Sequence, residues 1–349
     1  MDHVFHVDVF ADPGLPSRAV TQVLDTRQED DSEAEFVLHH NRRWIPLRDD
    51  GTLDMEAVKE WAHRDEADLM VIVTEIPRRA GRRVKMVGLH FEEGAAIISL
   101  PALGWSNVGK NLRAAMFDSL DALATDKVPG SGDTRIEYGV VHEQDSETGR
   151  SVYIASPWWW PGTVRLILGM VRTNEPFATV TKLSGVLAAA AGTGAFGIFY
   201  SSIWEMADAL PPWRLGLITV MVIATMVLWL LVSNGLWERS RQLGSLREAA
   251  MYNASTVATL FVAVASLYAV LFVGILLGGL IVIEAGFMSK TIGVEVSPWN
   301  YVDIAWLSAS MGTVAGALGS NFDSRDDISE LTHGRRQAQR FRQRQEEAE

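Results

Sequence analysis

Long apolar runs in the second half of the sequence constrain its fold more than any other feature. A helix that crosses the roughly 30 Å hydrocarbon core of a membrane needs about 20 mainly apolar residues. Four candidate segments follow one another, at about 183–203, 215–237, 255–283 and 301–318. The run 215–237 is unambiguous, whereas 183–203 is rich in Ala and Gly and 301–318 is short. The sequence therefore predicts an all-α transmembrane bundle of four helices over 183–321.

The first half of the sequence has the opposite character, because it is rich in charged residues. The 349-residue chain has a net charge of −12, and its densest acidic cluster lies at Glu29–Glu35. An acidic balance argues against a nucleic-acid partner, since phosphate backbones are bound by Lys and Arg. The chain contains no cysteine, which excludes disulfides, thiolate metal ligands and cysteine nucleophiles.

Residues 1–157 are predicted to form an α/β domain. Val4–Phe10 alternates polar and apolar residues and precedes an Asp-Pro-Gly turn, which is typical of a strand. Asp68–Thr74 is almost continuously apolar, as expected of a strand that is buried on both faces. Helical patterns alternate with the predicted strands, at about 16–27, 54–63 and 107–123. This alternation predicts an α/β sandwich with a mixed sheet.

Residues 158–182 are predicted to be a linker that contains an interfacial helix. Three tryptophans at 158–160 mark the border between the two halves, because indole rings favour the headgroup region of a membrane. Thr163–Val171 is apolar but too short to span the bilayer, and Arg165 and Arg172 flank it. We interpret this segment as a helix that lies on the cytosolic leaflet.

The distribution of Lys and Arg predicts how the spans are oriented. Cytoplasmic loops are enriched in these residues, and here they gather between the second and third spans and in the C-terminal segment 322–349. Both termini are therefore expected in the cytosol, with 322–349 as a charged cytosolic tail. The N-terminus lacks the basic and apolar regions of a cleavable signal peptide. We predict a multi-pass protein of the inner (cytoplasmic) membrane, with the lipid bilayer as its partner.

One segment of the soluble half resembles a phosphate-binding loop. Gly104, Gly109 and Lys110 fit the G-x-x-x-x-G-K pattern, in which backbone N–H groups cradle phosphates. The segment also lies between a predicted strand and a predicted helix, as the motif requires. Asn111 stands where the motif has a Ser or Thr that binds magnesium. The alternative interpretation is a glycine-containing turn from strand to helix.

A cluster of basic residues interrupts the acidic domain. Arg78, Arg79, Arg82 and Arg83 lie together after the apolar strand, followed by Lys85. They are candidates for contact with anionic lipid headgroups or with an acidic or phosphorylated protein partner. The alternative interpretation is a solvated loop, because charged loops are common.

Two glycine pairs in the predicted spans permit close approach of helices. Gly274 and Gly278 form one pair, and Gly312 and Gly316 form the other. The four-residue spacing places both glycines of a pair on one helix face, where backbones can pack closely. The pairs are expected to serve packing within the bundle, and a homo-oligomer contact is the alternative.

Two carboxylates, Glu284 and Asp303, lie near the outer ends of the third and fourth spans. A carboxylate inside a membrane is a candidate for transport or proton coupling, whereas one that reaches surface water needs no such role.

All eight histidines lie in the soluble half or the tail, and His142-Glu143 lacks the second His of a zinc-protease helix. The sequence therefore predicts no metal site and no cofactor.

The whole chain also resembles a known family. The segments that carry the resemblance are ADPGLP, DLMVIVTEIPRR, IISLPALG, TGAFGIFYSSIWEMADAL, LREAAMYNASTVATL and MGTVAGALGS. They are similar to a family of uncharacterised actinobacterial multi-pass membrane proteins with an N-terminal cytosolic α/β domain. The resemblance implies the same two-part layout and a location in the plasma membrane. It implies no activity.

These patterns lead to three hypotheses about function. The first is a non-enzymatic membrane protein whose cytosolic α/β domain is an interaction or sensing module with a cytosolic or membrane protein partner. The second is a transport component that uses the helix bundle. The third is a nucleotide-binding regulator that uses Gly104–Lys110.

Overall fold

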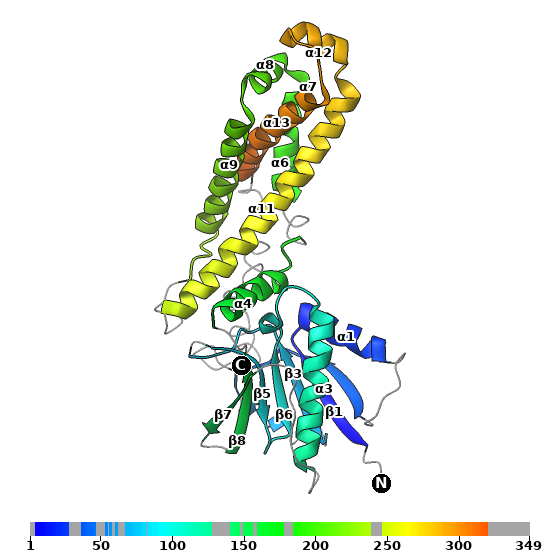
Figure 1. The fold of residues 1–349 in the computed structure, drawn as a ribbon, viewed down its shortest axis with the longest axis vertical. Helices are drawn as coiled ribbons and strands as arrows, with labels where there is room; N and C mark the ends of the chain where they lie inside the picture. The colour runs from blue at the N-terminus through cyan, green and yellow to red at the C-terminus, as the bar shows by residue number, and fades with distance from the viewer. Residues whose placement is uncertain are drawn as a thin grey trace, which may run out of the picture. The chain divides into compact units, whose positions relative to one another are not determined.

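The computed structural model of the protein divides into two compact units, which are described separately (Figure 1). The first contains residues 1–173 and 240–255, and the second contains residues 174–239 and the helices that follow residue 255. The structure describes residues 4–27, 36–46, 53–54, 56–57, 60–61, 67–81, 83–127, 140–146, 149–155, 159–177, 184–238 and 246–319. Arg82 and the predicted tail 322–349 lie outside these ranges.

The first unit is built on a mixed sheet with the strand order β2-β1-β3-β6-β5-β8-β7, and β4 pairs with β5. The strands are β1 (Phe5–Ala11), β2 (Phe36–Arg42), β3 (Leu69–Thr74), β4 (Arg79–Ala80), β5 (Arg83–His90), β6 (Ala95–Ser99), β7 (Val140–Ser146) and β8 (Gly149–Ala155). The first four strands of this order are parallel, and β5, β8 and β7 pair antiparallel. The predicted mixed α/β sheet is confirmed.

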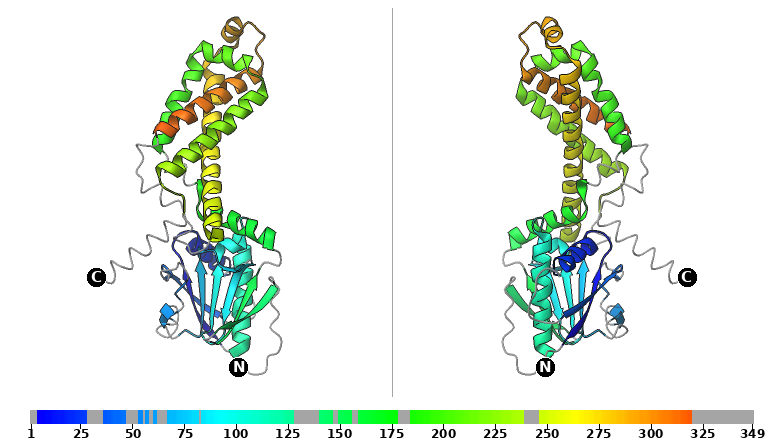
Figure 2. Two further views of the ribbon diagram at one scale, coloured as in Figure 1. Left: turned by 90° about the vertical axis from the view of Figure 1, so that its left-hand side faces the viewer. Right: turned by 90° about the vertical axis from the view of Figure 1, so that its right-hand side faces the viewer.

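Apolar layers cover both faces of this sheet. On one face, α1 (Leu15–Arg27) and α3 (Val108–Lys127) pack on the main core with the short helix η1 (Leu100–Leu103) (Figures 1 and 2). On the other face, Ile45 and Trp61 pack against Phe10, Met70 and Ile97. All six residues of β3 are buried because side chains of both faces meet a core. Each fully buried large side chain contributes roughly 1.5–3 kcal/mol.

The predicted interfacial helix belongs to the first unit. It is α4 (Trp159–Thr173), and its inner face packs Leu166 and Met170 into the main core. Gly169 lets this helix lie directly on η1, because a Cβ at that position would collide with the carbonyl oxygen of Pro101. Residues 159–173 therefore fold as part of the first unit.

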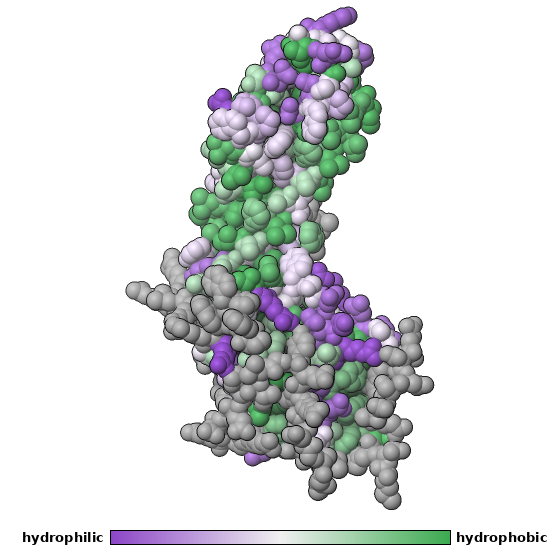
Figure 3. All heavy atoms as spheres, in the orientation of Figure 1, coloured by the Kyte–Doolittle hydropathy of each residue, from purple (hydrophilic) through white to green (hydrophobic). Residues whose placement is uncertain are grey.

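The second unit is helical. Its helices are α6 (Ser184–Gly194), α7 (Phe196–Phe199), α8 (Ser201–Ala209), α9 (Pro212–Ser233), α11 (Leu246–Val282), α12 (Ala285–Ile292) and α13 (Pro298–Gly319), of which α11 begins in the first unit. Figure 3 shows hydrophobic residues gathered on this unit along α9 and α11 and hydrophilic ones at the end that carries α12. The helical second half that the sequence predicts is confirmed.

Among the described residues, fewer helices than the predicted four are long and apolar enough to cross a membrane. Among the described residues, Pro212–Ser233 and Ala249–Val282 qualify, each with a mean hydropathy of 2.7. A third span results only if α6–α7 and α8 count as one, and that pair is bent by 85°. The bend occurs at Tyr200, whose extended backbone (φ −103°, ψ 109°) ends the helix. The expected straight span 183–203 is therefore a broken helix.

Among the described residues, the helix α13 is not one of the helices that qualify as spans. It contacts α6, α7, α8 and α9, and its buried positions are mostly small residues such as Ala305, Ala309 and Thr313. Small residues allow backbones to approach but contribute little apolar surface. The expected long span 255–283 is an unbroken part of α11, whose 37 residues extend about 55 Å at 1.5 Å per residue.

Candidate functional site

A buried carboxylate lies where the parallel strands β1 and β3 end. Asp12 follows β1 and is 0% exposed. Its Oδ2 accepts hydrogen bonds from Thr74 Oγ1 at 2.8 Å and from the Glu75 backbone N–H at 3.1 Å. Its Oδ1 accepts one from the Ile45 backbone N–H at 3.1 Å. One side chain therefore joins the chain segments that leave β1, β2 and β3.

This edge is where open α/β sheets bind ligands. The chain leaves β1 toward β2 on one side and β3 lies on the other, which makes a topological switch point. Here the polar groups satisfy one another, because Ser99 Oγ also donates to Ile76 O at 2.7 Å. We interpret Asp12 and Thr74 as structural. Neither residue belongs to a motif in the sequence, although an Asp directly after a predicted strand is a usable signal.

The segment Gly104–Lys110 begins directly after η1 and ends in the first turn of α3, and a side chain of α4 packs on it. The Cγ of Arg165 lies 3.0 Å from the position that a Cβ on Gly104 would take, and φ of Gly104 is +91°. Arg165 Nη2 donates to Leu103 O at 2.8 Å. Glycine is thus needed at this position for backbone conformation and for contact with α4.

The residue that replaces the magnesium-binding Ser or Thr closes the same loop. Asn111 Nδ2 donates to Leu103 O at 3.1 Å and to Ser106 O at 3.3 Å. Lys110 is exposed, and Gly109 would have only an ordinary contact with Gln22 if it carried a Cβ. This geometry explains the loop as a strand-to-helix turn. Nucleotide binding stays a prediction.

The basic residues after β3 do not share one environment. Arg78 is half-buried, and its Nη1 donates to Ile97 O of β6 at 3.3 Å. Arg79 Nη1 donates to the sulfur of Met251 at 3.8 Å. Arg83 is exposed on β5. The segment is therefore a β4–β5 hairpin with some inward-facing cations, and contact with a lipid or a protein partner stays a prediction.

Lys85 joins Arg78 on the sheet. Lys85 Nζ lies 4.6 Å from the centre of the Tyr153 ring, a cation–π geometry. Burial lowers the pKa of Arg78 to about 10. Burial, and then the positive charge of Arg78, lowers the pKa of Lys85 to about 8. These shifts show two cations in a place where the charged state is disfavoured.

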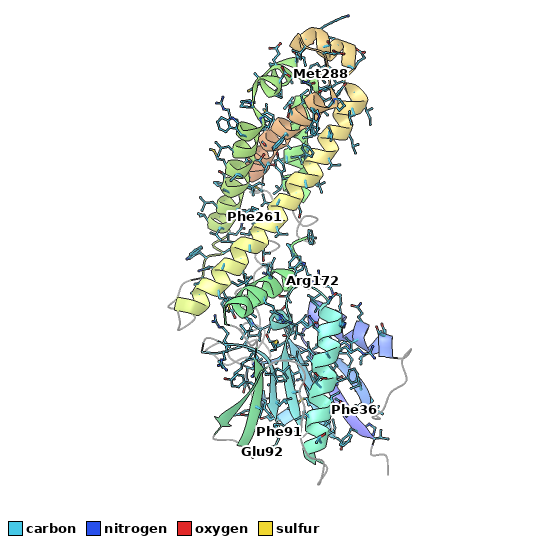
Figure 4. All side chains as sticks on the ribbon, viewed as in Figure 1. Phe36, Phe91, Glu92, Arg172, Phe261 and Met288 are labelled. Carbon is cyan, nitrogen blue, oxygen red and sulfur yellow. The ribbon has the colours of Figure 1, made fainter. Side chains whose placement is uncertain are left out.

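The outer face of α4 is apolar although it is exposed. Val164 and Leu168, one helical turn apart, are 42% and 45% exposed. Arg172 follows one turn later and is exposed, with its guanidinium 5.8 Å from the centre of the Trp105 ring (Figure 4). We call Val164 and Leu168 the α4 ridge. An apolar ridge beside a basic residue is typical of a helix at a membrane interface.

The two candidate membrane carboxylates have different surroundings. Glu284 is exposed and caps α12, because its carboxylate accepts hydrogen bonds from the N–H groups of Gly286 and Phe287. These hydrogen bonds lower the pKa of Glu284, which stabilises its charged form. Asp303 is half-buried on α13. The structure thus gives Glu284 a capping role and places Asp303 on α13, away from any helix cap that it describes.

The glycine pair on α13 faces another helix of the same unit. A Cβ on Gly312 would collide with the carbonyl oxygen of Ala190 in α6. A Cβ on Gly316 would lie 3.1 Å from Val186 O. The pair therefore brings α13 and α6 into backbone contact.

The glycine pair on α11 is divided. A Cβ on Gly278 would lie 2.9 Å from Ile198 Cδ1, whereas a Cβ on Gly274 would meet nothing within 4 Å. Gly278 therefore lies against a helix of its own unit. Gly274 is exposed and available to an outside partner.

A polar cluster joins three helices inside the second unit. Tyr268 Oη lies 3.1 Å from Thr219 Oγ1 and 3.1 Å from Ser310 Oγ, and donates to Trp306 O at 3.1 Å. Trp306 Nε1 donates to Thr219 Oγ1 at 2.6 Å. Because the cluster is uncharged and its groups bond one another, it fixes the register of α9, α11 and α13. The sequence analysis did not select these residues.

The described residues contain no group of three or more His, Cys, Asp or Glu side chains that could hold a metal ion. No protein-family model matches the chain, and no curated protein or solved structure matches it. The family resemblance noted from the sequence therefore stays a prediction.

Proposed function

We propose that the chain is an integral protein of the inner membrane whose α/β domain is a non-enzymatic interaction or sensing module in the cytosol. The observation that carries this proposal is the α4 ridge. A domain with a complete core exposes Val164 and Leu168 on its last helix, shortly before the apolar helices begin. An exposed apolar ridge at this place suits the headgroup boundary of a bilayer.

Exposed tryptophans at the two ends of α9 support the membrane part of the proposal. Trp213 at its start is 68% exposed, and Trp237 just beyond its end is 57% exposed. Tryptophan is favoured at both membrane–water interfaces because its ring is apolar and its N–H is polar. In this proposal α6–α7, α9, α11 and α13 form the four-helix transmembrane bundle, with α13 in contact with α6, α7 and α9.

Cysteine labelling tests the orientation. The chain has no cysteine, so a single substitution introduces the one reactive thiol. With both termini in the cytosol, Glu295→Cys, in the exposed link between α12 and α13, should react in intact cells with a membrane-impermeant maleimide. Asp25→Cys, exposed on α1, should react only after permeabilisation. Reaction of Asp25→Cys in intact cells would contradict the proposal.

A transport component is the second candidate, and the broken helix α6–α7/α8 favours it. Transporters use discontinuous helices to expose backbone groups to a substrate. Trp204 Nε1 donates to Gly197 O at 2.8 Å and so satisfies one such group. Transport predicts substrate flux in proteoliposomes that Asp303→Asn abolishes and Glu284→Gln does not. Equal flux in both variants and the wild type would remove Asp303 from the hypothesis.

A further inference from the structure

We propose that Arg78 and Lys85 form a binding site for an oxyanion of the phosphate type on the sheet face opposite α1 and α3. The proposal names a ligand class for the sensing module, and so it rests on the proposed function. The site consists of Arg78, Lys85, Gly88, Ile97 and Tyr153, all in the first unit.

Strand register places these residues on one face. Gly88 of β5 pairs with Ile97 of β6 on one side and with Tyr153 of β8 on the other. Residues paired across neighbouring strands point to the same side of a sheet. Ile97 packs in the cluster that faces away from α1 and α3, so this side is the second face.

Gly88 makes room for the guanidinium of Arg78. A Cβ on Gly88 would lie 2.9 Å from Arg78 Nη1 and 3.4 Å from Nη2. The planar group therefore lies against the strand at the one position without a side chain. A glycine inside a strand weakens the strand, and it often marks a position where another group approaches the backbone closely.

The hydrogen-bonding capacity of Arg78 is largely unused. Its guanidinium has five N–H donors, and among the described residues the side chain makes one hydrogen bond, to Ile97 O. A cation that is partly removed from water is stabilised by a counter-charge and by acceptors for its N–H groups. A phosphate group supplies both, because its oxygens match the planar fork of arginine.

Lys85 adds a second positive charge beside the first. Its backbone N–H donates to Arg78 O at 3.0 Å, so the two residues are held together. Two neighbouring cations repel each other, and an anion between them removes the repulsion and the burial penalty together. Because the whole chain carries a charge of −12, attraction for an anion must come from such a local pair.

Titration of the purified full-length protein in detergent with inorganic phosphate tests the site. We expect saturable binding that Arg78→Met weakens by about tenfold or more, as expected for a charge-assisted hydrogen bond. Gly88→Ala should also weaken binding, because its methyl group displaces the guanidinium without removing the charge. This variant keeps the test decisive if Arg78→Met does not fold.

Lys110→Met is the matched control, because it removes an exposed cation from the other candidate phosphate site. It should bind phosphate as the wild type does. Absence of saturable binding, unchanged affinity in both the Arg78→Met and Gly88→Ala variants, or loss of binding only in Lys110→Met would overturn the inference. The cysteine-labelling result is independent of all three, so a failure here is distinguishable from a failure of the proposed function.

The same titration identifies the source of the phosphate group. The full-length protein is placed in nanodiscs of phosphatidylcholine alone or with phosphatidylglycerol. If inorganic phosphate binds more weakly in the anionic discs, and if Gly88→Ala abolishes this difference between the discs, the site is supported with a lipid headgroup as its ligand. Equal binding in both discs supports the site with a soluble phosphate compound as ligand.

Discussion

At the scale of single residues, buried polar groups of the α/β domain fall into two kinds. Asp12 accepts three hydrogen bonds and joins three chain segments. Arg78 and Lys85 lie on the same sheet, yet burial disfavours their charges. Contacts of the first kind stabilise the fold, whereas residues of the second kind carry charges that their surroundings disfavour. We therefore expect the two kinds to respond to substitution in opposite directions.

Asp12→Asn should destabilise the α/β domain by about 1–3 kcal/mol. The substitution replaces one carboxylate oxygen by an NH2 group, so the groups that donate to that oxygen lose their acceptor. Urea unfolding of the full-length protein in detergent measures the effect. Asp25→Asn, on the exposed surface of α1, serves as the control and should leave the midpoint unchanged. Equal midpoints for the two variants would show that the Asp12 contacts contribute nothing.

Lys85 should make stability depend on pH above neutrality. Its pKa is about 8 in the folded protein, against an ordinary value of 10.5. Between these values the unfolded chain binds the additional proton, so stability rises with pH across this window. Lys85→Met should flatten this rise, and it should raise the free energy of unfolding at pH values below the window. Urea midpoints measured across the window test both effects. Lys110→Met should keep the rise, and a rise that persists in Lys85→Met would assign it elsewhere.

At the scale of elements, glycines set how closely helices pack in each unit. Gly169→Ala should push α4 away from the carbonyl of Pro101 and destabilise the α/β domain by about 1–3 kcal/mol. Gly109→Ala adds the same methyl group inside α3 at an ordinary contact, where alanine favours helix by up to about 1 kcal/mol. Thermal unfolding should separate the two variants, and similar loss in both would contradict the packing described for α4.

The glycine pairs of the helical unit allow a matched comparison. Gly312→Ala should lower the melting temperature in detergent, because its methyl group meets the backbone of α6. Gly274→Ala adds a methyl group to open space and should not. If Gly274 instead mediates a homo-oligomer, size-exclusion chromatography should show dissociation in Gly274→Ile. Identical melting of both alanine variants and the wild type would exclude tight α13–α6 packing.

At the scale of the whole molecule, the proposed function places the two units in different solvents. In this proposal water drives burial of the core of the α/β domain, whereas lipid or detergent solvates apolar helices such as α9. Urea should therefore unfold the full-length protein in two steps, and circular dichroism can monitor both. Asp12→Asn should shift only the first step. A single transition that shifts as a whole would show that the units unfold together.

Local patterns determined much of this architecture before the structure was known. The apolar run at 68–74 indicated a strand buried on both faces, and the run at 215–237 indicated a helix for lipid, because both features concern the solvent around one segment. Composition could not show the break at Tyr200, since the residues on both sides favour helix. It also could not show that α13 packs against other helices through small buried residues.

Only the tertiary structure decided which distant residues meet. Asp12 contacts residues 33 and 62 positions away, Gly88 accommodates Arg78 from the segment that precedes β4, and Gly312 faces a helix more than a hundred residues earlier. The physical reason is that periodicity reports what one element buries, whereas a site depends on strand order and register. The sequence by itself determined a charged α/β half and a helical half with long apolar segments, and the sheet topology determined which polar groups of the α/β domain come together.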